Sequence, residues 1–160
     1  MTIRPDQIAN AYLEWIEGKP FGPSIAVTLT FRQFDGKQIS RKLAENAISH
    51  YLRVLDRKAF GAQARRGKRQ LGAFGVFEGD AESWGKNLHY HCLLQIPSHV
   101  MPEQWIRTCE MEWAKVRYSN RQHHFEEVWD EAGWSEYLLK LRDKKDYADA
   151  VDVINIRMPK

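Results

Sequence analysis

The segment Asn87–Pro97 constrains the fold most, because its aromatic and aliphatic residues form a short run between a glycine-containing turn and a proline. This pattern predicts a buried β-strand. Successive side chains of a strand point to opposite faces, so His89 and His91 share one face, about 7 Å apart along the chain. The other face carries residues suited to a core: Leu88, Tyr90, Cys92 and Leu94.

Two neighbouring imidazoles on an otherwise apolar strand are costly unless something binds them. Neutral imidazole is the commonest metal ligand in proteins, so His89 and His91 are candidate ligands. The alternative is a pair of hydrogen-bonded histidines on a half-exposed face of a sheet. The spacing of the two residues fits both interpretations.

The composition predicts one globular domain over residues 1–160, because 43% of the residues are hydrophobic and the chain can bury a sizeable core. The net charge of +3 says little about partners. Cys92 and Cys109 have no metal-binding spacing and indicate no disulfide framework, which is typical of a reducing compartment. No apolar run approaches membrane-spanning length and no signal peptide is recognised, so we expect a soluble, cytoplasmic protein.

The order of the predicted elements is α β α β β α β α β. Helices are expected over residues 6–17, 40–58, 102–118 and 131–145, and strands over residues 24–31, 71–78, 87–97, 123–129 and 151–158. The last strand is inferred from the alternation of Val151–Met158. This order predicts an α+β fold, in which helices flank a central, largely antiparallel sheet of four to five strands.

The segment Arg57–Arg69 contains six basic residues and no acidic one. Gly61 and Gly67 predict that it forms a loop. Such a segment suits contacts with phosphates, and the alternative is an ordinary solvated loop. The candidate DNA-binding residues are Arg57, Lys58, Arg65, Arg66, Lys68 and Arg69.

A carboxylate precedes the histidines in the predicted hairpin. If residues 79–87 form its loop, Glu78 lies opposite His89 or one step diagonal to it, within the reach of a shared metal ion. Two histidines and one carboxylate leave coordination positions open, which is typical of a catalytic metal that polarises a phosphoryl oxygen. Glu82 is a competing third ligand, although its position in the loop is also typical of a solvated surface residue.

The predicted helix over residues 131–145 carries Tyr137 on its apolar stripe, and Lys140 lies one turn further on. Beside a metal-bound phosphate, a tyrosine hydroxyl held in line is a credible covalent nucleophile. Lys140 could stabilise the charge that develops during the attack. The ordinary alternative is that Tyr137 is a core aromatic residue and Lys140 extends to water.

Three motifs together resemble the HUH endonuclease superfamily, and most closely its single-tyrosine rolling-circle replication initiators. They are Val27–Phe31, which is similar to the first motif of the family, the histidine–hydrophobic–histidine triplet His89–His91, and the Tyr-x-x-Lys motif Tyr137–Lys140. Their order is that of the family, and they span residues 25–140.

The resemblance implies a sheet-centred fold and a Mn²⁺ or Mg²⁺ ion held by His89, His91 and an upstream acid, for which Glu78 is the candidate. It also implies that Tyr137 attacks a phosphate of single-stranded DNA. The products are a 5′-phosphotyrosyl link and a free 3′ hydroxyl. Lys140 assists the tyrosine.

The chain departs from other branches of the superfamily. Many members carry a helicase domain after the nuclease, so we expect another protein to unwind the origin. The second tyrosine of two-tyrosine enzymes and the glutamine of insertion-sequence transposases are both replaced by Leu141. Relaxases use an N-terminal tyrosine with three histidines, and no third histidine accompanies the pair at the required spacing. These departures favour a small replication initiator of a phage, virus or plasmid.

Three other functions fit parts of the pattern. A transposase or mobilisation enzyme would share the chemistry and differ in its DNA. A non-catalytic nucleic-acid-binding module would bind indifferently to metal and tolerate His89→Ala. A structural metal site would affect only thermal stability.

Overall fold

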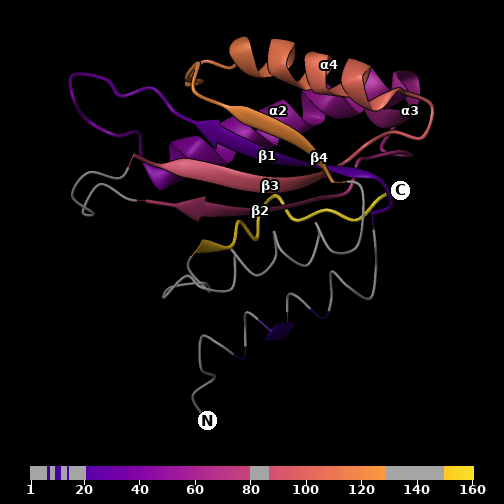
Figure 1. Cartoon of the computed structure of the whole chain (residues 1–160), viewed down its shortest axis with the longest axis horizontal. Helices are drawn as coiled ribbons and strands as arrows, with labels where there is room; N and C mark the ends of the chain where they lie inside the picture. The colour runs from indigo at the N-terminus through magenta and orange to yellow at the C-terminus, as the bar shows by residue number, and fades with distance from the viewer. Residues whose placement is uncertain (1–6, 8–9, 12–13, 15–20, 80–86, 129–149) are drawn as a thin grey trace.

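The computed structural model describes residues 21–79, 87–128 and 150–160, together with residues 7, 10, 11 and 14. These residues adopt an α+β fold with a four-stranded antiparallel sheet of order β2-β3-β1-β4 (Figure 1), as the sequence predicted. The elements are β1 (Ser24–Thr30), α2 (Arg41–Phe60), α3 (Ala62–Arg65), β2 (Ala73–Glu78), β3 (His89–Gln95), α4 (Pro102–Ala114) and β4 (His124–Val128). The helix expected over residues 131–145 and most of that over residues 6–17 lie outside the described residues.

The histidine strand β3 lies inside the sheet, between β2 and β1. In the register, His89 pairs with Glu78 of β2 and with Thr30 of β1. His91 pairs with Thr28 of β1, and Thr28 pairs in turn with residue 124 of β4. Because side chains alternate along a strand, all of these side chains belong to one face of the sheet.

Helices α2 and α4 cover the opposite face. Ser40 caps α2 by accepting a hydrogen bond from the backbone N–H of Leu43 at 3.2 Å, which satisfies a donor that the helix leaves unpaired. The apolar stripe of α2 then packs against the sheet and α4 in one hydrophobic core. Its largest fully buried members include Ile25, Leu29, Ile48, Tyr51, Leu55, Tyr90, Trp105 and Trp113.

The C-terminal segment 150–160 runs beside the outer edge of β2. Two isolated bridges, Val76–Val151 and Ala73–Arg157, join it to that strand. The expectation of a regular strand over residues 151–158 is therefore wrong. The chain turns at residues 153–155 because Asn155 donates from its backbone and from its side chain to Asp152, at 3.1 and 2.6 Å.

The expectation that Arg57–Arg69 forms a loop is also wrong for most of the segment. Helix α2 continues to Phe60, and α3 follows after a single intervening residue. That residue is Gly61, whose φ of 55° ends α2. The alanines on both sides favour helix, so the glycine interrupts the helical segment without unwinding it. Only the part that follows α3 is irregular.

Candidate functional site

The structure brings Glu78, His89 and His91 to one end of the sheet face that points away from α2 and α4. Glu78 lies directly opposite His89 in the register, and its diagonal neighbour is His91. The His91 Nε2 atom lies 2.8 Å from Glu78 Oε2. The side chains of His91 and Glu78 are 22% and 37% exposed, so a ligand can approach them from solvent. The cross-strand position expected of Glu78 is confirmed, and its role as a ligand stays a prediction.

Thr28 holds the His91 ring from the other side. Its Oγ1 atom lies 3.2 Å from His91 Nδ1, so both ring nitrogens have a neighbour. Without an ion, Nε2–H of a neutral His91 donates to the Glu78 carboxylate and the Thr28 hydroxyl donates to Nδ1. In the other tautomer Thr28 accepts from Nδ1–H, and the lone pair of Nε2 is then available to a metal ion. Metal-binding histidines are commonly oriented in this way, with the second nitrogen bonded to a neighbouring acceptor.

The separation of the Glu78 and His91 donor atoms suits adjacent ligands of one ion. Two atoms that each lie about 2.1 Å from a metal, at a right angle, are about 3.0 Å apart. The 2.8 Å between Nε2 and Oε2 is close to that value. A carboxylate with imidazoles is also a donor set that divalent transition ions bind well. These two residues therefore fit a metal.

The ring of His89 is stacked beside that of His91. The two rings are nearly parallel, with 6.4 Å between the ring centroids and 17° between the planes. Within the part of the chain that the structure describes, no group of three His, Cys, Asp or Glu side chains could hold a metal ion. His89 completes the set of ligands only if its ring turns toward Glu78, the neighbour with which it pairs.

The face around the site is polar toward β4. The buried hydroxyl of Thr30 donates to the carbonyl of Gln122. On β4 itself, His124 Nε2 lies 3.5 Å from Glu126 Oε2, and both side chains are about 70% exposed. Further along the same face the residues are apolar, where Phe74, Val76 and Leu93 meet Ala150 and Val151. A polar ligand would therefore meet the end of the sheet that carries the histidines.

Several predicted site residues lie outside the described part of the chain. They are Tyr137 and Lys140, the proposed nucleophile and its helper, and Glu82, the competing third ligand. Their roles stay predictions.

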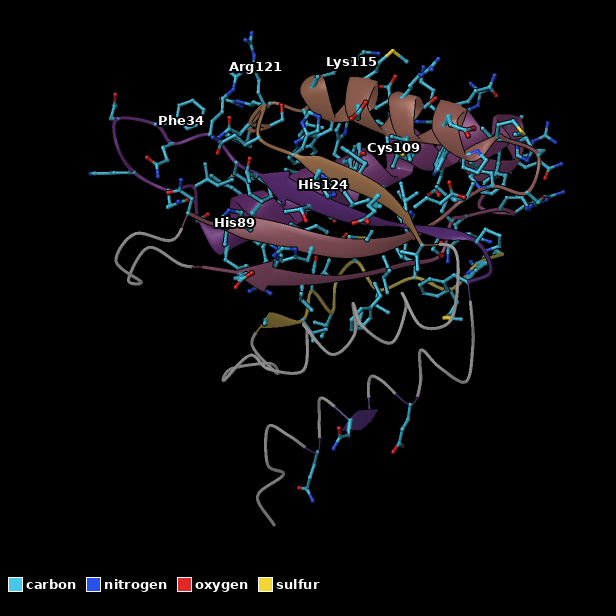
Figure 2. The ribbon with its side chains drawn as sticks, in the orientation of Figure 1. Phe34, His89, Cys109, Lys115, Arg121 and His124 are labelled. Atoms are coloured by element: carbon cyan, nitrogen blue, oxygen red, sulfur yellow. The ribbon has the colours of Figure 1, made fainter. Side chains whose placement is uncertain are left out.

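The basic segment that was predicted to bind DNA lies at the other end of the sheet. Figure 1 shows α3 at the end opposite to that where His89 is labelled in Figure 2, and the seven residues of β3 span about 20 Å. Two basic side chains of the segment Arg57–Arg69 make contacts within the protein. Lys58 Nζ lies 3.3 Å from Glu112 Oε1, while Arg69 donates to the Lys160 carbonyl at 3.0 Å and covers the ring of Phe60.

Sequence reasoning missed the contact of Thr28 with His91. Its alternation with Thr30 on a predicted strand was visible, but which strand would pair with the histidines was not. The sheet order brings β1 beside β3 and places this hydroxyl against His91.

Comparisons with protein-family models, with curated proteins and with solved structures returned no match. Among the described residues, no helix has both the length and the apolar character needed to cross a membrane.

Proposed function

We propose that this protein is a metal-dependent nuclease that acts on single-stranded DNA. More particularly, we propose a single-tyrosine HUH replication initiator, which nicks and rejoins an origin to start rolling-circle replication of a phage, virus or plasmid. One observation carries the proposal: Glu78 is fixed opposite His89 and in contact with His91, and the His91 and Glu78 side chains are partly exposed. The sequence motifs supply the rest.

His91 and Glu78, with His89, would hold the Mn²⁺ or Mg²⁺ ion. When bound, such an ion polarises a phosphoryl oxygen and neutralises part of the charge on the phosphate. Thr28 keeps the His91 ring in the orientation that presents Nε2 to Glu78. Because β3 has a strand on each side, the backbone that carries both histidines is held in place before any ligand arrives.

Tyr137 is the proposed nucleophile. Its phenolic oxygen forms a bond to phosphorus and loses its proton to solvent, while the bond between phosphorus and the 3′ oxygen breaks. The leaving oxygen takes up a proton and becomes the free 3′ hydroxyl, and the 5′ phosphate stays attached to the tyrosine. Lys140 stabilises negative charge on the phosphate or the phenolate. Attack by a 3′ hydroxyl on the phosphotyrosine reverses the step and rejoins the strand.

The test is a nicking assay on a panel of short single strands, with Mn²⁺ and the full chain. We expect a covalent protein–DNA adduct, in which mass spectrometry locates the phosphate on Tyr137. Tyr137→Phe should form no adduct, and Tyr147→Phe, a nearby tyrosine outside the motif, should form it normally. An adduct formed by Tyr137→Phe would refute the assignment of the nucleophile.

A non-catalytic module that binds nucleic acid is the second candidate, because the exposed ring of Phe34 and several exposed arginines lie at the same end of the sheet as His89. It predicts DNA binding that is the same in Mn²⁺ and in EDTA, and no covalent adduct with any strand. The nicking assay therefore separates the two functions.

We further propose that the protein works in the host cytoplasm, together with a helicase supplied by another protein. The state of the cysteines supports this location. Both Cys92 and Cys109 are free thiols in the buried core, as is usual in a reducing compartment.

A further inference from the structure

An aromatic side chain stands out from the sheet near the candidate metal site. Phe34 lies in the connection between β1 and α2 and is 49% exposed. Its ring meets that of Tyr118 edge to face, with 5.7 Å between centroids. Figure 2 shows Phe34 at the same end of the sheet as His89. Phe34 follows Thr30, the β1 partner of His89, by four residues, which is at most about 14 Å of extended chain.

The backbone holds Phe34 in this position. Phe34 and Lys37 exchange two backbone hydrogen bonds of 2.9 Å. Asp35 and Gly36 between them have φ values of 50° and 72°, as a tight two-residue hairpin turn requires. The turn therefore fixes the backbone of Phe34, whose ring is about half exposed.

The same turn is tied to the histidine strand. The side chains of Gln33 and Gln38 both donate to Asn87 Oδ1, at 2.6 and 3.1 Å. Asn87 lies two residues before His89. The position of the Phe34 ring is therefore fixed relative to the strand that carries the candidate ligands.

The surroundings of Phe34 are basic. Segments 31–40 and 115–125, which meet through the Phe31–Ser119 bridge, contain five basic residues, and Asp35 is their one acidic residue. The Arg117 guanidinium lies 5.3 Å from the centre of the Tyr118 ring. Three arginines at this end are exposed: Arg32, Arg117 and Arg121. We call Phe34, Tyr118 and these three arginines the aromatic–basic surface.

We infer that the aromatic–basic surface binds single-stranded DNA, with an unpaired base stacked on Phe34 and the neighbouring phosphates on the arginines. An exposed ring among cations is the combination that single-strand-binding proteins use. Within segments 31–40 and 115–125, Phe34 is the one large apolar side chain that is strongly exposed, which is too small an apolar area for a typical protein interface. The inference rests on the proposed function for its choice of DNA, and it assigns the binding to residues that the sequence analysis did not select.

The test is fluorescence anisotropy of a labelled 20-mer of thymidylate, dT20, with the full chain in EDTA. Phe34→Ala should weaken binding about tenfold, because stacking contributes most of the interaction of one base. Phe34→Trp, which keeps an aromatic ring, should bind about as tightly as wild type. Arg117→Ala and Arg121→Ala should each reduce the slope of log K against log salt by about 0.7. Arg53→Ala with Arg107→Ala, two exposed helix arginines away from this surface, is the charge-matched control and should leave the affinity within twofold.

An abasic strand of the same length supplies the second arm. Wild type should bind it more weakly than dT20, whereas Phe34→Ala should bind the two strands equally. Equal affinities of wild type and Phe34→Ala for dT20, or no binding of dT20 by wild type, would overturn the inference. The inference would also be overturned if Arg65→Ala with Arg66→Ala lost more affinity for dT20 than Arg117→Ala with Arg121→Ala. That result would indicate that the DNA binds at the other end of the sheet.

The assay is independent of nicking, because it contains no metal and needs no nucleophile. A loss of affinity in Phe34→Ala without any covalent adduct in the nicking assay would support the surface and refute the proposed function. If the adduct forms but Phe34→Ala leaves the affinity for dT20 unchanged, the proposed function is supported and the role of the surface is refuted. Circular dichroism and the melting temperature of each variant show whether it folds, and an exposed residue such as Phe34 is expected to tolerate both substitutions.

Discussion

Thr28 and Glu78 restrain the same imidazole from opposite sides, at 3.2 and 2.8 Å. Thr28→Val keeps the branched shape that suits a strand and removes only the hydroxyl. We expect it to weaken Mn²⁺ binding about tenfold, a usual cost of losing a residue that orients a ligand. Isothermal titration calorimetry measures this directly, with His50→Ala, an exposed helix residue, as control. Equal affinities of Thr28→Val and wild type would show that the hydroxyl does not orient the ring.

Both cysteines should be chemically inert in the folded protein. Burial raises the pKa of Cys92 to about 12 and that of Cys109 well above its ordinary range. Because the thiolate is the reactive form, a thiol reagent at pH 8 should modify neither residue in the native state and both in denaturant. Absorbance of the released thiol product counts the reacted groups. A native cysteine that reacts within seconds would contradict this prediction.

At the scale of elements, the C-terminal segment joins β2 to α2. Arg157 makes a two-pronged contact with Asp56 of α2, at 2.5 and 3.2 Å, and Asp56 also accepts from the backbone of Leu71 at 2.9 Å. Both charged side chains are largely buried. The segment thereby covers an edge strand that would otherwise expose unpaired backbone groups.

Arg157→Ala should lower the free energy of unfolding by about 3 kcal/mol, because it leaves the Asp56 carboxylate buried without its cation. Urea denaturation followed by circular dichroism measures the change. Arg107→Ala, which removes an exposed arginine from α4, should change it by less than about 0.5 kcal/mol. A cost below about 1 kcal/mol for Arg157→Ala would mean that the contact with α2 contributes little.

Glu112 joins the two long helices. Its carboxylate lies 2.8 Å from Lys115 of the same helical segment and 3.3 Å from Lys58 of α2. These lysines, Lys115 first, lower the pKa of Glu112 below its ordinary value of 4.5. A group whose pKa is lower in the folded state stabilises the fold above its unfolded pKa and loses that effect as the pH falls.

Glu112→Gln should therefore lower the melting temperature at pH 7. The difference from wild type should shrink as the pH falls below 4.5 and toward the lower folded pKa. Calorimetric melts at a series of pH values test this. A difference that stays constant across this range would show that the loss comes from packing and not from charge.

How far the sequence predicts this fold differs between elements. The alternation in β1 and β3 predicts both strands, since Val27 and Leu29 are buried on one side while Thr28 and His91 lie on the other. The basic segment misleads, because its glycines suggest a loop while its alanines continue the helix. The C-terminal alternation misleads for another reason: a local turn between Asp152 and Asn155 competes with strand pairing. Periodicity does not register such contacts.

For the candidate site too, local patterns predict some features and miss others. Counting residues through the hairpin places Glu78 opposite His89, because a hairpin fixes the register of its two strands. The aromatic–basic surface depends on contacts between segments that are more than 80 residues apart, such as Arg32 with Tyr118. No local pattern reports these contacts. The sequence therefore predicts the candidate ligands and not the side chains that surround them.

For the whole molecule, metal binding should appear as thermal stability. A ligand that binds only the folded state stabilises it by about 2.7 kcal/mol at a concentration of 100 Kd. We expect Mn²⁺ to raise the melting temperature of the full chain, EDTA to reverse the rise, and Glu78→Gln to abolish most of it. Differential scanning fluorimetry suffices for the measurement. An equal rise in wild type and Glu78→Gln would place the ion elsewhere.

The interior position of β3 also affects how often its backbone hydrogen bonds open in the folded protein. Its backbone amides bond to strands on both sides, so they should exchange with deuterium only when the whole sheet opens, whereas those of β4 should exchange through local fraying. A site built on the slowest-exchanging strand loses little conformational entropy when it captures its ligand. The histidines would then spend their binding free energy on the ion and the DNA, and not on ordering their own backbone.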